Sequence, residues 1–418
     1  MRKKVLVRAP LLTQSGYGEH SRFVIRSLRS REDLFDIYLE PINWGQTGWI
    51  SKKSEENEWL NKMIAKTAVY VRENPSFDIS IQVTIPNEWE KLAPVNIGVT
   101  AGIETTKVDP LWLEKANIMD KVIVVSKHAK MGFDKTSYTG KHRETGETKL
   151  IKCEVPVEVV GYPVRDYDPA DIDIDFKHNF NYLTMAQWGP RKNIINTIRW
   201  FVEENHDQKV GLVVKTSLRN GSYGDRALTQ KNLDNILSDF KDRKCSVYLL
   251  HGTMEPEEIS ALYKHPKIKA FVGIAHGEGF GLPLFEAAYN ALPVIAPGWG
   301  GQCDFLYMSK DGKKPKAAFA EVNYDISPVQ EEAHWEGVVT PDSMWCYPHQ
   351  GSYKMRLRQV RKNYSKWKKK AEELSEHLRE TFSSEQQYEK IVTAIYQKSE
   401  TDLEVDQMFN KLMGKTNQ

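Results

Sequence analysis

Short apolar runs alternate with longer mixed segments along most of the chain. In the first part, the apolar runs lie at residues 5–7, 35–39, 79–83, 96–100 and 121–125. In the second part, they lie at residues 182–186, 211–215, 246–250, 269–274 and 293–296. Each run has the length of a buried strand, and the segments between the runs have the length and periodicity of amphipathic helices. Regular alternation of this kind predicts two α/β units, each built on a parallel sheet.

A turn and an acidic linker divide the two series. The turn Gly161-Tyr162-Pro163 precedes an Asp- and Pro-rich stretch at 166–171, and this composition is typical of a boundary between domains. We therefore predict an N-terminal Rossmann-like domain at 1–164 and a C-terminal Rossmann-like domain at 165–385.

The last long pattern, at 359–397, is helical, and we expect the segment 386–418 to pack back on the N-terminal domain. A basic run at 354–370 overlaps the start of this pattern and holds nine Lys or Arg and no Asp or Glu. Because the whole chain carries +2, those nine cations leave −7 on the rest of it. Two interpretations stay open: a helix with one buried face and one solvated basic face, or a surface that contacts phosphate.

The composition is that of a folded globular protein. Of the 418 residues, 40% are hydrophobic and 27% are charged, and the mean hydropathy is −0.54. Apolar runs such as 122–125 and 292–296 fall far short of the roughly 18 residues that a bilayer span needs. The first residues pass directly into a strand pattern without an export signal, so the cytoplasm is the expected compartment. The four cysteines lack the paired spacing of a zinc site or a disulfide framework.

A glycine-containing loop follows the first strand. Gly16 and Gly18 lie between that strand and a helix, and Glu40 ends the second strand, which superficially matches a dinucleotide-binding fingerprint. Ser21 stands at the third glycine position, and the loop from Pro10 is too long for the tight turn, so a nicotinamide dehydrogenase is disfavoured. Two interpretations stay open: a turn that only starts the helix, or a loop whose amides face a ligand between the domains.

The most informative segment of the chain is 276–301. The strand at 271–274 is followed by a glycine-rich loop, and loops at the carboxyl ends of strands are where α/β sheets bind ligands. Leu282-Pro283 starts a helix, whose free amides favour a phosphate group. Glu278 lies in the loop and Glu286 lies in the first turns of the helix, where a carboxylate can accept hydrogen bonds from both hydroxyls of a ribose. The alternative is that Glu286 caps its own helix and Glu278 is solvated.

The order of these residues resembles the donor-binding motif of family-4 retaining glycosyltransferases, which have the GT-B fold. In this chain the motif reads Glu278-Gly-Phe-Gly-Leu-Pro and continues to Glu286-Ala, followed by a Pro-Val-Ile strand and paired glycines. The resemblance implies an α/β protein whose two Rossmann-like domains face an interdomain cleft. It also implies that Glu278 approaches the transferred sugar and that Glu286 holds the ribose of the nucleotide. Gly279, Phe280 and Gly281 match the segment that meets the sugar and the phosphates.

The resemblance covers most of the chain and assigns further positions. Lys192 matches a lysine that contacts the donor diphosphate, and together with Glu278 it is a candidate catalytic residue. Glu104 is the nearest candidate for the group that many members place beside the sugar, so a catalytic role is also expected for it. The other residues expected to bind the donor are Arg191, Gln187 (where the family often has Arg), Lys215, His251, Gly252 and His276, together with Gly16 and Gly18. Further candidates near the cleft are His20, His128 and Asp304.

The expected reaction moves a sugar from a nucleotide sugar, with a UDP-sugar as the expected donor, to a hydroxyl group. Breaking the bond between sugar and diphosphate places negative charge on the leaving group, which Lys192, Arg191 and the helix amides would stabilise. No metal and no other cofactor is then required, since the nucleotide sugar is a substrate and the acidic stretch 171–175 lies in the linker. The resemblance implies that the sugar is transferred with retention. A non-catalytic nucleotide-sugar or nucleic-acid binding protein of the same fold is the alternative.

Clusters of basic residues predict that the acceptor is a polyanion. Arg22, Arg26 and Arg29 share one face of the first helix, and 127–152 holds seven Lys or Arg against three acids. DNA and lipid-linked or other glycans all fit, because basic side chains respond to phosphate without distinguishing its carrier. The N-terminal run at 8–20 also looks like that of glycosyltransferases encoded by large tailed phages. This second resemblance implies hydroxymethylated pyrimidines in phage DNA as acceptors and the host cytoplasm as the compartment.

Overall fold

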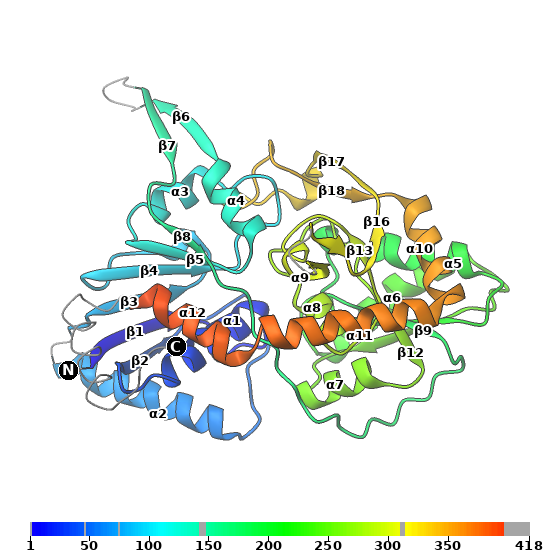
Figure 1. The fold of residues 1–418 in the computed structure, drawn as a ribbon, viewed down its shortest axis with the longest axis horizontal. Helices are drawn as coiled ribbons and strands as arrows, with labels where there is room; N and C mark the ends of the chain where they lie inside the picture. The colour runs from blue at the N-terminus through cyan, green and yellow to red at the C-terminus, as the bar shows by residue number, and fades with distance from the viewer. Residues whose placement is uncertain (1, 46, 74–75, 142–147, 310–313, 397–418) are drawn as a thin grey trace.

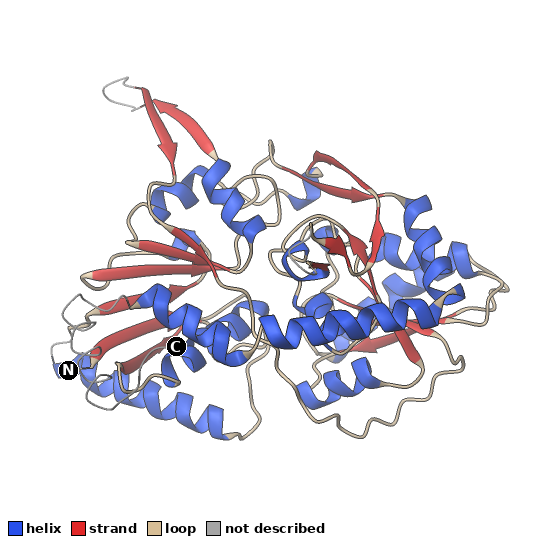
Figure 2. Cartoon of the chain, viewed as in Figure 1, coloured by secondary structure: helices blue, strands red, loops and turns tan. Residues whose placement is uncertain are grey.

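Two six-stranded parallel sheets, each packed against helices, form the two halves of the molecule (Figures 1 and 2). The computed structural model describes residues 2–45, 47–73, 76–141, 148–309 and 314–396. In each sheet the chain starts at an inner strand, runs to one edge, and then crosses to build the other side. This doubly wound order is typical of Rossmann-like units, so the expected α/β fold with two such units is confirmed.

The first sheet has the strand order β2-β1-β3-β4-β5-β8, with all neighbours parallel. Its strands are β1 (Lys3–Ala9), β2 (Phe35–Pro41), β3 (Ile79–Val83), β4 (Val95–Thr100), β5 (Lys121–Val124) and β8 (Val157–Val159). Its helices are α1 (Gly16–Arg29), α2 (Glu55–Tyr70), α3 (Pro110–Ala116) and α4 (Lys127–Lys135), with short 3-10 turns η1 (Val71–Glu73) and η2 (Pro86–Glu88). Every residue of β3 is buried, including Ser80 and Gln82, whose side chains donate hydrogen bonds to Asn96 and to the backbone oxygen of Glu90.

The second sheet has the order β11-β10-β9-β12-β13-β16 and is also parallel throughout. Its strands are β9 (Asn181–Met185), β10 (Gly211–Thr216), β11 (Ser246–His251), β12 (Ile268–Val272), β13 (Val294–Pro297) and β16 (Ala320–Val322). Its helices are α5 (Ile194–Asn205), α6 (Tyr223–Leu237), α7 (Pro256–Lys264), α8 (Leu282–Tyr289) and α9 (Cys303–Leu306), with the 3-10 turn η3 (Pro190–Lys192) and the short pair β14 (Tyr307–Met308) and β15 (Lys316–Ala317).

Three helices, and not one continuous helical pattern, end the described chain: α10 (Gln350–Lys362), α11 (Tyr364–Thr381) and α12 (Ser384–Ile395). The breaks fall at Asn363, whose backbone angles are not helical, and at Ser383, whose side chain caps α12. Helix α11 runs from the second half toward the first, where α12 packs against α1 (Figure 1). Of the predicted segment 386–418, residues 397–418 lie outside the described residues. The domain limits given above stay predictions.

The basic run at 354–370 lies on α10 and α11, and acids of α5 pair with part of it. Lys354 pairs with Glu203 at 2.6 Å, and Arg358 pairs with Glu204 at 2.8 Å. The other face of α10 is buried in the core of the second half. The structure therefore favours the interpretation of a helix with one buried face and one solvated basic face.

Two antiparallel hairpins extend from the sheets. The first, made of β6 (Ser137–Lys141) and β7 (Thr148–Lys152), projects outward from the first half as the arm at the top left of Figure 1. The second, made of β17 (Tyr324–Pro328) and β18 (Met344–Pro348), belongs to the second half. The segment between β17 and β18, residues 329–343, is called the strap below and contains the turn η4 (Glu331–Ala333). Residues 142–147 of the predicted basic segment 127–152 lie outside the described residues. In the described part of the chain, no helix is both long and apolar enough to cross a membrane.

Candidate functional site

The carboxyl ends of the two sheets meet and touch. Ser126, just after β5, donates a hydrogen bond from its hydroxyl to the backbone oxygen of Gly279 at 2.6 Å. A Cβ at Gly279 would lie 2.4 Å from the backbone oxygen of Ala101, and a Cβ at Gly277 would lie 2.1 Å from that of Glu104. Only glycine permits backbones to approach so closely. In this structure the close approach at Gly279, which the sequence suggested for a ligand, is made by the backbone of the other half.

Four charged side chains gather where these edges meet, and we call them the donor-edge cluster: Arg191, Lys192, Glu278 and Glu104. Lys192 Nζ donates to both carboxylate oxygens of Glu278, at 2.5 and 2.7 Å. Arg191 lies 3.4 Å from the same carboxylate and 3.2 Å from the carboxylate of Glu104. Burial acts to raise the pKa of Glu278, but Lys192 and Arg191 outweigh burial and hold that pKa below its usual range. The structure thus brings together the three residues expected to be catalytic and the arginine expected at the diphosphate.

Local backbone geometry places these side chains side by side. Arg191 and Lys192 form the turn η3 after β9, and Asn193 ends that turn in the left-handed conformation, with φ of 53°. Asn tolerates this conformation better than most residues, and its amide anchors the turn by donating to the backbone oxygen of Ile274 at 3.1 Å. On the facing loop, Gly281 is the N-cap of α8 with φ of 93°, and no side chain caps the helix. The amide groups in the first turn of α8 are therefore available to an anion.

Glu286 lies farther along α8 and has no ion-pair partner among the described residues. Its Oε2 accepts a hydrogen bond from the hydroxyl of Tyr263 at 2.9 Å. Burial raises the pKa of Glu286 to about 7, and the charge of Glu19 adds to this effect. The carboxyl oxygen that Tyr263 does not contact is free to accept a hydrogen bond from a ligand hydroxyl.

Three residues predicted to bind the donor lie at the ends of β10 and β11. Lys215 Nζ donates to the backbone oxygen of Gly252, and burial lowers the pKa of Lys215. His251 bonds Asp225 at 2.7 Å, and its side chain is only 3% exposed. Asp225 also accepts the backbone N–H of Leu218. The pair therefore ties the end of β11 to α6 and, through Asp225, to the loop after β10. Lys215 contacts the loop after β11 at Gly252.

Three other predicted donor residues are engaged within the protein. His276 stacks on Trp345 of β18, with ring centroids 5.0 Å apart. Phe280 is 4% exposed and belongs to the aromatic core that joins the two halves. Gln187 donates to the backbone oxygen of Leu218 at 3.0 Å. These contacts are packing and loop contacts, and a role in donor binding for the three residues stays a prediction.

The two glycines of the loop before α1 have different surroundings. A Cβ at Gly18 would lie 2.1 Å from the backbone oxygen of Thr13, so Gly18 allows the loop to fold on itself. Ser15 caps α1 by accepting the backbone N–H of Gly18 at 3.0 Å. A Cβ at Gly16 would have no neighbour within 4 Å. The helix-starting turn therefore accounts for Gly18, and Gly16 borders open space.

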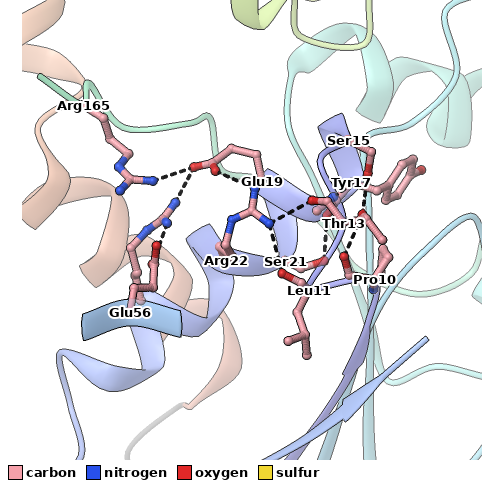
Figure 3. A network of polar contacts seen from close by, with 12 residues as sticks. Pro10, Leu11, Thr13, Ser15, Tyr17, Glu19, Ser21, Arg22, Glu56 and Arg165 are labelled. Carbon is pink, nitrogen blue, oxygen red and sulfur yellow. Dashed lines mark hydrogen bonds and ion pairs between the residues drawn. The ribbon is translucent and has the colours of Figure 1, made fainter. Parts of the chain in front are cut away.

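A second ionic cluster, which no sequence pattern indicated, joins α1 to the linker between the halves (Figure 3). This linker cluster consists of Glu19, Arg22, Arg26 and Arg165. Glu19 pairs with Arg22 at 3.2 Å, with Arg165 at 2.9 Å, and with Arg26. Burial acts against ionisation of Glu19, but the three guanidinium groups prevail and lower its pKa to about 2. The cluster fixes the linker against the first helix.

The arginines of α1 do not form the free basic face that was expected. Arg22 donates to two backbone oxygens of the preceding loop, both at 3.0 Å. Arg26 pairs with Glu56, and Arg29 pairs with Glu55, both at 2.8 Å. The expectation is wrong because Glu19 of the same helix pairs with Arg22 and Arg26, and acids of α2, distant in sequence, pair with Arg26 and Arg29.

The remaining candidates near the contact are buried or bonded. His20 is fully buried, and burial lowers its pKa to about 3, so it is a neutral core histidine. His128 packs edge-on against Trp299 with ring centroids 4.7 Å apart, and burial lowers its pKa to about 4. Asp304 accepts the backbone N–H of Lys127 at 2.7 Å, which links the two halves at the start of α4.

The strap ties the second half to the first, and no motif in the sequence predicts this contact. The backbone oxygen of Gly337 accepts hydrogen bonds from Asn87 at 2.8 Å and from Trp112 at 3.0 Å. Val338 is buried in the core of the first half. The signal in the sequence was the length of the stretch without helix or strand periodicity, because long loops of this kind in compact proteins are usually functional.

Within the described ranges, no group of three or more His, Cys, Asp or Glu side chains is placed to hold a metal ion. The four cysteines are free thiols.

Solved structures of glycosyltransferases share the fold. Sucrose-phosphate synthase from Thermosynechococcus elongatus matches with a TM-score of 0.59 at 12% identity, over 99% of this chain and 100% of that chain. A glycosyltransferase from Rickettsia africae matches with a TM-score of 0.59 at 13% identity, over 95% of this chain and 100% of that chain. HepE from Anabaena, in complex with UDP and glucose, matches with a TM-score of 0.54 at 13% identity, over 94% and 98%. The chain has the GT-B fold of these proteins.

A weaker likeness is to TarM from S. aureus, with a TM-score of 0.48 at 15% identity over 79% of this chain. The chain spans 58% of the length of that TarM structure. No protein-family model and no curated protein matches the chain. At these identities the likeness establishes the fold, and the activity has to be inferred from the side chains at the site.

Proposed function

We propose that the protein is a glycosyltransferase that moves a sugar from a nucleotide sugar to a hydroxyl group. The observation that carries this proposal is the position of Arg191 and Lys192 beside the uncapped start of α8. Two cations and a helix N-terminus suit a diphosphate, and they lie at the sheet edge where α/β proteins bind nucleotides. Two carboxyl groups, Glu278 and Glu286, flank this anion site on the same loop and helix.

Each group has a distinct role in the proposed reaction. The cations and the α8 amides bind the diphosphate and stabilise the negative charge that grows on it as the bond to the sugar breaks. In other enzymes one such donor contributes about 2.7–4 kcal/mol. Glu278, held between Lys192 and Arg191, approaches the transferred sugar. Glu286 accepts hydrogen bonds from the ribose hydroxyls, and contact between the two halves excludes water from the sugar.

A UDP-sugar is the proposed donor. Support comes from HepE, which has the same fold and was solved in complex with UDP and glucose. Because Arg191, Lys192 and the α8 amides can all contact a diphosphate, we propose transfer without a metal ion. Retention of configuration is proposed from the resemblance of the segment from Glu278 to Glu286 to the family-4 motif.

A nucleotide panel tests the donor. Thermal-shift measurements with UDP, GDP, ADP and NAD are expected to show a raised Tm with one of the three diphosphates, because such a ligand binds only the folded state. Stabilisation by NAD alone would contradict the proposal. Mass spectrometry of products from labelled UDP-sugars then tests transfer.

Two variants separate the roles of the two carboxyl groups. Glu278→Gln is expected to bind the stabilising nucleotide at least as tightly as the wild type does but to transfer little sugar. Glu286→Gln is expected to weaken nucleotide binding, since an amide accepts fewer hydrogen bonds from ribose hydroxyls than a carboxylate does. Equal nucleotide affinity in both variants would contradict the assignment of the ribose to Glu286.

A polyanionic acceptor is proposed from the charge of α4 and the hairpin β6–β7. Helix α4 begins next to Ser126, which contacts the site, and the hairpin follows directly along the chain. The exposed basic side chains on these two elements include Lys127, Lys135, Lys149 and Lys152. DNA with hydroxymethylated pyrimidines is one acceptor of this class, and a phosphate-containing glycan is another.

Salt dependence tests the acceptor proposal. The double variant Lys149→Glu, Lys152→Glu is expected to weaken binding of a duplex oligonucleotide, with a slope of log K against log salt that falls by about 0.9 for each lost phosphate contact. The double variant Lys362→Glu, Lys369→Glu makes the same change of charge at exposed positions of the second half and is the control. Equal loss in both variants would contradict the hairpin as the DNA-binding surface. No binding of the duplex by the wild type argues against DNA and leaves the glycan arm to be assayed in the same way.

A further inference from the structure

The cations of the donor-edge cluster are fully engaged by the protein itself. Lys192 bonds both oxygens of Glu278, and Arg191 divides its guanidinium among Glu278, the backbone oxygen of Gly277 and Glu104. Two carboxylates therefore balance two cations. A diphosphate that enters this site has to replace one of the carboxylates, because three anionic groups around two cations repel one another.

The two carboxylates differ in how firmly they are held. Glu278 belongs to the same half as both cations, its side chain is 13% exposed, and Lys192 holds it by two short contacts. Glu104 comes from the loop after β4 in the other half, its side chain is 26% exposed, and it makes a single contact of 3.2 Å to an arginine that is 32% exposed. A single, partly exposed ion pair typically contributes about 1 kcal/mol or less to stability. The contact between Glu104 and Arg191 is therefore the one that breaks when another anion binds.

The geometry of the contact between the halves ties this exchange to opening and closing. Glu104 stands in the same loop whose backbone touches Gly277 and Gly279. Any separation of the two sheet edges that admits a ligand also withdraws Glu104 from Arg191. The other acids nearby are engaged elsewhere: Glu286 with Tyr263, and Asp304 with the backbone of Lys127.

We propose that Glu104 holds the place of the donor diphosphate on Arg191 when no donor is bound, and that the donor displaces it. This inference rests on the proposed function. It makes Glu104 a positioning residue that keeps Arg191 ordered and closes the empty site, in place of the catalytic role that the family resemblance suggests.

The test compares anion affinity in two variants that each remove one ion pair between the halves. Glu104→Gln removes the proposed competitor, and Asp342→Asn removes the pair between the strap and Lys107, far along the chain from the cations. Inorganic pyrophosphate and UDP are titrated by calorimetry at low salt. Glu104→Gln is expected to bind both about five-fold more tightly than the wild type, and Asp342→Asn is expected to bind them as the wild type does. If Glu104 served only to hold Arg191 in place, Glu104→Gln would bind both anions more weakly than the wild type.

A double-mutant cycle shows whether the competition acts through Arg191. In an Arg191→Ala background, Glu104→Gln is expected to change the affinity by less than about two-fold, since the contested cation is gone. In 1 M salt, where charges are screened within about 3 Å, the gain from Glu104→Gln is expected to shrink. Unchanged or weaker binding by Glu104→Gln, or an equal gain in the Arg191→Ala background, overturns the inference.

If the proposed function is wrong, the same binding measurements give a different result from the one expected if only the inference about Glu104 is wrong. If neither UDP nor pyrophosphate binds the wild type, or if Lys192→Ala binds both as the wild type does, no diphosphate site exists at this edge and both proposals fail. If the wild type binds and Lys192→Ala weakens binding, while Glu104→Gln has no effect, only the inference about Glu104 fails.

Discussion

The two ionic clusters between the halves use the same kinds of side chain in opposite ways. In the linker cluster, one carboxylate, Glu19, lies among three guanidinium groups, and the side chains of Arg22 and Arg26 are only 11% and 13% exposed. In the donor-edge cluster, two carboxylates meet two cations, and the arginine of the pair that spans the two halves is 32% exposed. The carboxylates do not differ in this way, since Glu19 is 29% and Glu104 is 26% exposed. Removing a partner from the first cluster strands a buried charge, whereas the second can exchange one anion for another.

The two clusters show how charged side chains that stabilise the fold can be told from charged side chains placed to bind a ligand. The linker cluster joins α1 to the linker, and Arg22 is also bound to backbone oxygens, so its geometry is fixed by the chain itself. The donor-edge cluster lies where the carboxyl ends of two parallel sheets meet, and one of its members is supplied by the opposite half. Burial and charge alone do not distinguish the two. Position relative to the sheet edges does.

The largest expected effect is on turnover in Lys192→Ala. Loss of the cation beside the leaving diphosphate is expected to lower kcat about 100- to 1000-fold, which corresponds to roughly 2.7–4 kcal/mol. Consumption of the labelled UDP-sugar measures it. Lys354→Ala is the matched control, because Lys354 also pairs with a glutamate at 2.6 Å but lies on α10, and its turnover is expected to stay that of the wild type. Similar turnover in both variants would remove the functional distinction between the donor-edge cluster and an ordinary ion pair.

The next effect is on stability in Glu19→Gln. Three guanidinium groups lose their shared carboxylate, and the free energy of unfolding is expected to fall by about 3 kcal/mol. Urea denaturation measures it. The control is Glu55→Gln, because that carboxylate pairs with Arg29 at the surface and its side chain is 88% exposed, so wild-type stability is expected. If Glu19→Gln is as stable as this control, the linker cluster does not hold the molecule together.

The smallest effect is a pH dependence at Glu286. Its pKa is raised from 4.5 to about 7 in the folded protein, so the folded state retains a proton that the unfolded state releases. The contribution of this group to stability is therefore present below pH 4.5 and is lost as the pH rises from there to about 7. Glu286→Gln is expected to remove this slope.

The affinity for the nucleotide is expected to change with pH in the opposite direction to the stability. The ionised carboxylate accepts more hydrogen bonds from ribose hydroxyls, so UDP affinity is expected to rise a few-fold between pH 6 and pH 8 in the wild type. The diphosphate itself titrates near pH 6, and Glu286→Gln is the control that reports this ligand effect alone. Identical pH profiles for the two proteins would show that Glu286 does not titrate at the ribose.

Much of the fold could be predicted because its signals are local. A strand buried in a parallel sheet is rich in apolar residues, and ten of the twelve strands in the two sheets were visible as such runs. The short strands β8 and β16 at the sheet edges were not predicted. The turn at Gly281 and the helix that follows it were also visible, since a glycine that can adopt the left-handed conformation and a Pro in the first helical turn are strong local signals. The same segment of the sequence also predicted that Glu278 lies in the loop and Glu286 lies on the helix. The arginines of α1 were misjudged because Glu55 and Glu56 of α2 lie far away along the chain, and because the prediction left out Glu19, a partner on the same helix.

The sequence by itself determined the two parallel sheets and put the acids and glycines of 276–301 on one loop and helix, because strand burial, turns and helix starts depend on neighbouring residues. Only the tertiary structure decided that Glu104 faces Arg191, that Arg165 joins Glu19, and that the strap docks on the first half. These contacts depend on how two separately folded sheets come together, and no spacing along the chain encodes the orientation of one rigid half against the other.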